Sequence, residues 1–209
     1  METTYNVLPA KAKRFLTQLS DYLGIPLLYY GSIQRTDFFE GHSDIDVDIF
    51  TDNEDSTLNM MQQFMKRPAY KFKKVAWRLH DSKQMVYGHK IMYKDPQDEF
   101  KVEFSIYNER FKENILAEHI KKTVLPWYCT LILLILKTLH YKMGIFPDEI
   151  FSYLKNKILT LFIGEADAEF VSIEPNKKRG GHGEEEDIKK ENEKGVKEKG
   201  LYEHLGGLL

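Results

Sequence analysis

The stretch YYGSIQRTDFFEGHSDIDVDIF, residues 29–50, contains a Gly-Ser pair followed by three aspartates at alternate positions. Side chains of a β-strand alternate between its two faces, so Asp44, Asp46 and Asp48 are expected on one face and the aliphatic residues between them on the other. An acidic face is common on a strand that contacts solvent on one side. It is equally the arrangement expected at a binding site for divalent cations, and the rest of the sequence has to distinguish the two interpretations.

The composition limits the class of protein. The chain has 209 residues, of which 42% are hydrophobic and 13% aromatic, as in a globular domain with its own core. The formal net charge of -2 gives no global basic field that would attract nucleic acid. The single cysteine, Cys129, lies in an apolar run and can form no intramolecular disulfide, which fits a reducing compartment.

Membrane and secretion signals are not expected. The N-terminal residues contain no apolar stretch of the kind that a secretory signal needs. The most apolar segment, residues 124–144, contains Lys137 and His140 and falls short of the ~20 apolar residues needed to span a bilayer. We therefore expect an intracellular protein, cytoplasmic or nuclear, without a membrane segment.

The order of predicted elements indicates an α+β fold. Periodic apolar positions predict a helix over residues 8–23, and charge order predicts another over 52–67. Strands are expected near 26–30 and 43–51 and in three runs between residues 70 and 107, and helices are expected from 108 to 164. We expect a mixed β-sheet flanked by helices in residues 1–107, a helical region in 108–171 and a disordered tail in 172–209. The segment 176–209 carries eight basic and eight acidic residues and few apolar ones.

The Gly-Ser pair favours the cation-binding interpretation. Gly31 and Ser32 directly follow an apolar strand, and backbone N–H groups at such a turn can bind a phosphate. Carboxylates on one strand face can gather around two divalent ions ~3.5–4 Å apart, as in phosphoryl-transfer sites. Without metal, two such charges ~6 Å apart repel each other by ~3 kcal/mol at an effective dielectric constant of 20. A phosphate site beside a metal site is what a nucleoside triphosphate requires.

The same residues resemble a known family. Gly31-Ser32, a loop, and then Asp44-Ile45-Asp46 resemble the signature of the DNA polymerase β-type nucleotidyltransferases, over roughly residues 8–107. The resemblance implies transfer of a nucleoside monophosphate from a triphosphate such as ATP to a hydroxyl acceptor, with release of pyrophosphate. It also implies Mg²⁺ (or Mn²⁺) ions held by Asp44, Asp46 and a third carboxylate on a later strand. Many small members have a glycine a few residues after Gly-Ser, whereas the next glycine here is Gly41.

Glu103 is the predicted third carboxylate. It is the only acid inside the strand FKVEFSIY, residues 100–107, and glutamate is depleted in strands. It could complete the metal site or accept the proton of the attacking hydroxyl. A paired surface glutamate is the alternative. Asp48 is a second candidate, although it lies ~13 Å along the strand from Asp44.

Other residues are predicted to bind the nucleotide. Arg35 follows the Gly-Ser pair and is expected to contact phosphate, with a solvated arginine as the alternative. Lys137 and Tyr141 are four residues apart on one helix face, so they could present an ammonium to the triphosphate and a ring to the base; an ordinary helix surface is the alternative. The acceptor can be a nucleic acid, a protein or a small molecule. The rival hypothesis is a non-catalytic, antitoxin-like module that binds a nucleotide or a partner.

Overall fold

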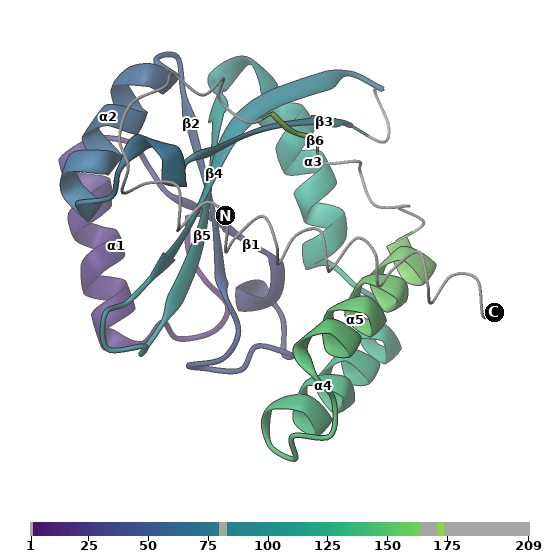
Figure 1. Cartoon of the computed structure of the whole chain (residues 1–209). Coiled ribbons are helices and arrows are strands. Elements are labelled where there is room, and N and C mark those ends of the chain that lie inside the picture. The colour runs from purple at the N-terminus through teal and green to yellow at the C-terminus, as the bar shows by residue number, and fades with distance from the viewer. Residues whose placement is uncertain (1, 80–82, 164–170, 174–209) are drawn as a thin grey trace, which may run out of the picture. The chain divides into compact units, whose positions relative to one another are not determined.

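The computed structural model describes residues 2–79, 83–163 and 171–173 (Figure 1). Residues Met1–Pro175 form one compact unit. The second unit, Asn176–Leu209, lies outside the described residues, and so does nearly all of the predicted disordered tail.

The described residues confirm an α+β protein. The helices are α1 (Ala10–Leu23), α2 (Glu54–Met65), α3 (Lys112–Thr123), α4 (Trp127–Tyr141) and α5 (Asp148–Ile163). The strands are β1 (Leu28–Tyr30), β2 (Ile45–Thr51), β3 (Lys73–Arg78), β4 (Met85–Lys94), β5 (Lys101–Asn108) and β6 (Val171–Ile173). Strand β6 was not predicted, and it lies across the expected boundary between the helical region and the tail. The Gly-Ser pair itself begins a 3-10 turn, Gly31–Gln34.

The strands form one mixed sheet in the order β1-β2-β5-β4-β3-β6. Strands β2 and β5 are parallel, and the other pairings of the described sheet are antiparallel. The chain leaves β2 through α2, forms the β3–β4–β5 meander and returns to the other side of β2 (Figure 1). The mixed sheet flanked by helices is therefore confirmed.

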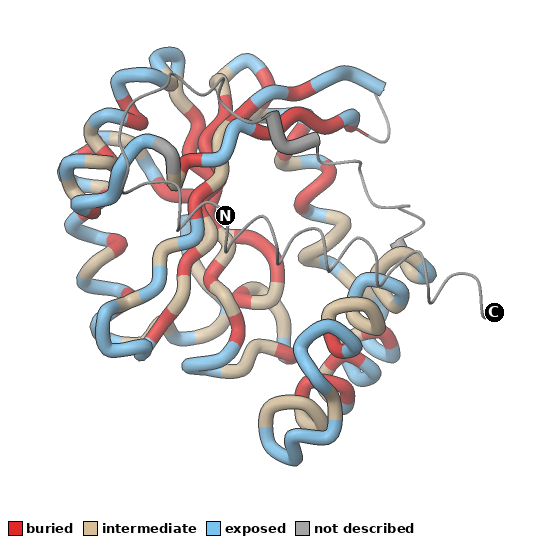
Figure 2. Tube along the Cα trace, in the orientation of Figure 1, coloured by how far each residue is buried: buried red, intermediate tan, exposed pale blue. Residues whose placement is uncertain are grey.

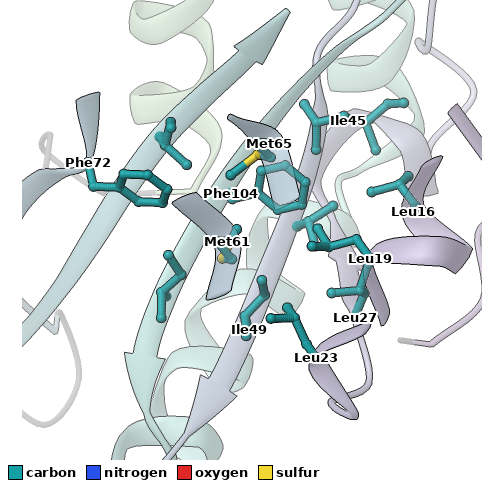
Figure 3. Packing of buried hydrophobic residues seen from close by; sticks show 14 of the residues in the cluster. Leu16, Leu19, Leu23, Leu27, Ile45, Ile49, Met61, Met65, Phe72 and Phe104 are labelled. Carbon is teal, nitrogen blue, oxygen red and sulfur yellow. The ribbon is translucent and has the colours of Figure 1, made fainter. Parts of the chain in front are cut away.

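The main core lies between the sheet and helices α1 and α2 (Figure 3). Helix α1 contributes Leu16, Leu19 and Leu23, which lie on one face because of their spacing of three and four residues. The aliphatic residues of β2 are fully covered, as their alternation with the aspartates predicted. The aspartates consequently lie on the face of the sheet that α1 and α2 do not cover.

Helix α3 covers only part of this second face. A smaller cluster joins Ile115 of α3 to Trp77, Val86 and Tyr107 of the sheet. Gly88 of β4 makes room for it, since a Cβ there would meet the ring of Tyr107. Figure 2 shows the buried positions following the central strands, while the outward surfaces of the helices are exposed.

Within the described part of the chain, no single helix is long and apolar enough to cross a membrane. One pair of consecutive helical segments, Glu109–Thr123 and Trp127–Tyr141, is long and apolar enough when the two are taken together. The two segments are bent by 72° relative to each other.

Candidate functional site

Gly31 and Asp46 form the centre of the candidate site. Asp46 of β2 is paired with Tyr30 of β1, so its carboxylate lies beside the turn that follows β1. Gly31 has a φ of 70°, and a Cβ built on it would overlap Oδ2 of Asp46. A glycine is needed at this position for two reasons, because the backbone is left-handed and because the carboxylate lies against the Cα atom.

Three carboxylates influence one another at this point. Asp46 and Glu103 are paired across the parallel strands β2 and β5, so their side chains lie on the same face. Asp44 precedes β2 by one residue. Burial, followed by the charges of Glu103 and Asp44, raises the pKa of Asp46 to about 7. Burial also raises the pKa of Asp44, although the charges of Lys101 and Lys155 oppose that effect.

Glu103 makes an ion pair in this structure. Its Oε1 atom lies 2.6 Å from Nζ of Lys90 on the adjacent strand β4, and both side chains are partly exposed. Among the residues that the structure describes, no three acidic, histidine or cysteine side chains are arranged to hold a metal ion directly. Oε1 of Glu103 is thus engaged with an ammonium and not with the neighbouring carboxylate side chains.

Asp48 lies on the same face as Asp46 but is directed elsewhere. It is completely buried, and its Oδ2 atom is 2.6 Å from Nδ1 of His119 on α3. The imidazole of His119 is stacked on the ring of Tyr30, with 4.0 Å between the ring centroids. Asp48 thus pairs with α3 and does not point into the cleft beside Asp46.

A cleft of about 160 Å³ opens next to Asp44 and Asp46. All five residues predicted to bind the nucleotide line this cleft, together with the unpredicted Lys155 of α5. They are Gly31, Ser32, Arg35, Lys137 and Tyr141. A larger cleft of about 300 Å³ lies near Thr51 and Asp52, and none of the predicted site residues lines it.

Arg35 and Lys137 are already bound to a buried carboxylate that the sequence analysis missed. Asp37 is fully buried; its Oδ1 is 2.7 Å from Nε of Arg35, and its Oδ2 is 2.9 Å from Nζ of Lys137. Arg35 also donates to the carbonyl of Lys122 at 2.6 Å, and Lys137 donates to the carbonyl of Asp37 at 2.8 Å. Arg35 is therefore not a solvated arginine, and Lys137 is not an ordinary surface lysine.

The negative charge of Asp37 and the positive charges of Arg35 and Lys137 stabilise one another. Burial opposes ionisation of Asp37, but its hydrogen bonds and ion pairs with Arg35 and Lys137 hold its pKa below the usual value. Burial lowers the pKa of Lys137, which Asp37 partly restores. The cluster connects the loop between β1 and β2 to helix α4, so it fixes the wall of the cleft.

Lys155 is a further cleft residue that the sequence analysis did not assign, and His42 contacts the cleft residue Tyr141. Lys155 lines the cleft, and its positive charge favours the ionised forms of Asp44 and Asp46. The imidazole of His42 is stacked on Tyr141 at a centroid distance of 4.9 Å. Burial, followed by the charge of Asp44, raises the pKa of Tyr141 to about 12, so the phenol is protonated at neutral pH. Helical periodicity alone could not have identified Lys155, because its place at the cleft depends on the packing of α5 next to α4.

Comparison of the chain with models of known protein families and with curated protein sequences gave no match in either case. The functional argument therefore rests on the residues of the site and their geometry.

Proposed function

We propose that the protein is a metal-dependent nucleotidyltransferase, which transfers a nucleoside monophosphate from a triphosphate to a hydroxyl acceptor and releases pyrophosphate. The observation that carries the proposal is the position of Asp46. Its carboxylate lies against the glycine of a Gly-Ser turn and is paired in register with Glu103. Side-chain packing alone does not favour carboxylates that lie so close to one another that each raises the pKa of the next.

The donor set fits a divalent cation. Asp44, Asp46 and Glu103 offer only carboxylate oxygens, which are the ligands that Mg²⁺ and Mn²⁺ prefer. The pKa of Asp46, about 7, reflects negative charges that a cation would neutralise. When bound, the cation supplies electrostatic stabilisation of the charge that develops on the phosphate oxygens.

The remaining roles fall to the chain's own groups. Gly31 and Ser32 line the cleft, where their backbone N–H groups would bind the triphosphate, and the ammonium of Lys155 adds positive charge there. The carboxylate of Glu103 accepts the proton of the acceptor hydroxyl as its oxygen attacks the α-phosphorus. The bond from that phosphorus to the bridging oxygen breaks, and pyrophosphate leaves with the electron pair.

Thermal unfolding tests the binding step. Magnesium or manganese together with a nucleoside triphosphate should raise the melting temperature of the wild-type protein. Asp44→Asn combined with Asp46→Asn should abolish the increase. Asp21→Asn, the same chemical change at an exposed position of α1, should leave it intact. An unchanged increase in the double variant would contradict the site assignment.

Transfer is tested with labelled triphosphates, manganese or magnesium, and a panel of RNA, DNA, protein and small-molecule acceptors. Label should move to one class of acceptor in the presence of the wild-type protein only. Absence of transfer to every acceptor, together with intact triphosphate binding, would favour the second candidate function below.

The second candidate is a non-catalytic module that binds a nucleotide or a partner. The ion pair between Lys90 and Glu103 favours it, because Oε1 of Glu103 contacts an ammonium at the position that the first proposal gives to a metal ion or a hydroxyl. Under this function, Glu103→Gln would leave metal–triphosphate binding unchanged and no pyrophosphate would be released.

A further inference from the structure

The part of the sheet face that α3 leaves uncovered carries lysines beside the carboxylates. Residues paired across neighbouring strands lie on the same face of a sheet. Because Met92 is paired with Glu103, the alternate residues of β4 and their partners on β3 and β5 share the face of the candidate site. Its basic members are Lys73, Lys90, Lys94 and Lys101.

These lysines are arranged as two like-charged pairs. Lys94 is directly opposite Lys101, and Lys73 is directly opposite Lys90. Like charges directly opposite each other destabilise a sheet. Lys90 is paired with Glu103 at 2.6 Å. Lys94 pairs with Asp98 at 3.0 Å, where both side chains are more than half exposed and solvent screens the attraction. An anion bound across both pairs would relieve the repulsion.

The lysine pairs are continuous with the carboxylate cluster. Lys101 acts on the pKa of Asp44, and Lys90 is in contact with Glu103. Met92, 48% exposed, separates the two pairs along β4 and offers an apolar surface between them. Gly31, Ser32 and Lys155 line the cleft at Asp44 and Asp46, whereas the lysine pairs extend over β4 and β3, beyond Glu103.

We propose that this lysine face, defined by Lys73, Lys90, Lys94 and Lys101, binds the acceptor, and that the acceptor is a polynucleotide. The inference rests on the proposed nucleotidyltransferase function and deepens it. Three carboxylates repel an anionic acceptor, so an acceptor of that charge needs flanking cations, whereas a neutral acceptor does not. In a polynucleotide the terminal hydroxyl is within one residue of a phosphate. When that hydroxyl lies at the carboxylates, the phosphate therefore lies close by, and lysines beside the carboxylates are in position to bind it.

Fluorescence anisotropy with labelled 20-nucleotide single-stranded RNA and DNA measures this binding, without triphosphate, between 50 and 200 mM salt. The test variant combines Lys73→Glu and Lys94→Glu, because neither residue belongs to the proposed triphosphate site. The control combines Lys13→Glu and Arg14→Glu, which make the same charge change at exposed positions of α1 on the opposite side of the sheet. Thermal unfolding with and without metal and triphosphate is recorded for all three proteins.

The test variant should bind the oligonucleotide at least about tenfold more weakly than wild type, and its slope of log affinity against log salt should be shallower by about 1.4. The control should stay within about twofold of wild type, and all three proteins should keep the thermal shift with metal and triphosphate. Equal oligonucleotide affinity in the test variant and the control would overturn the inference while leaving the proposed function intact.

Equally tight binding of poly-glutamate to the wild-type protein would indicate a general anion surface and overturn the assignment to a polynucleotide. Lysine-dependent oligonucleotide binding without any metal–triphosphate shift would support the surface and reject the proposed function instead.

Discussion

Asp46→Asn should stabilise the metal-free protein at alkaline pH. The pKa of Asp46 is about 7 in the folded protein, compared with an ordinary value of 3.8. Because the folded pKa is raised, the folded state binds the proton more tightly than the unfolded state does. The contribution of this group to stability therefore falls as the pH rises from about 4 to about 7, and the full penalty is present at pH 8.

The difference of about three pKa units corresponds to about 4 kcal/mol as an upper limit. The Asp46 side chain is not completely covered, so water screens part of the repulsion, and a gain of at least about 1 kcal/mol is expected for the asparagine variant at pH 8. At pH 4 the wild-type carboxyl is protonated in the folded state, and the two proteins should differ little.

Urea unfolding at pH 4 and pH 8 in the presence of EDTA measures the difference. Asp21→Asn, on the exposed side of α1, is the matched control and should change the free energy of unfolding by less than about 0.5 kcal/mol at either pH. Adding Mg²⁺ at pH 8 should stabilise the wild type and not Asp46→Asn. Equal destabilisation of the variant at both pH values would refute the reasoning, since it would show that Asp46 makes a favourable structural interaction.

Gly31→Ala should abolish the metal–triphosphate thermal shift, because its Cβ would overlap a carboxylate, whereas Gly41→Ala, also at positive φ but in open space, should only reduce stability by about 1 kcal/mol. Equal effects of the two substitutions would contradict the close approach at the first glycine. Lys137→Met should lower the free energy of unfolding by about 3 kcal/mol in urea titrations, because it leaves a buried carboxylate with one cationic partner instead of two. A variant as stable as wild type would show that the buried ion pair is not formed. Glu103→Gln should reduce pyrophosphate release by ~10²-fold or more, and Asp48→Asn, whose carboxylate pairs with α3, by less than about tenfold. The reverse order would make the second aspartate the third carboxylate.

The parts of the site that follow strand periodicity were predictable. Alternation placed Asp44 and Asp46 opposite the aliphatic core residues, and the single acid of the β5 run identified Glu103 as their neighbour. Contacts that depend on tertiary packing were not predictable. The partners of Arg35, the carboxylate of Asp37 and the carbonyl of Lys122, are set by how the loop packs against the helices.

Lys155 and strand β6 were not predicted because their positions also depend on contacts between distant segments. Lys155 reaches the cleft only because α5 packs next to α4, which periodicity within one helix does not specify. The three residues of β6 gain their strand conformation from pairing with β3, since so short a segment has little preference of its own.

The parallel pairing of β2 with β5 has a consequence for the order of folding. The β3–β4 and β4–β5 pairs join segments that are adjacent in the chain, whereas β2 meets β5 only after α2, β3 and β4 have been bridged. Pairings between distant segments close slowly, because loop-closure entropy is lost before the contacts form. We therefore expect Asp46 and Glu103 to become neighbours in a late step. A peptide comprising residues 29–50 carries the whole aspartate motif but lacks the carboxylate that this late step adds, so the proposed ion binding requires the folded sheet and not the motif alone.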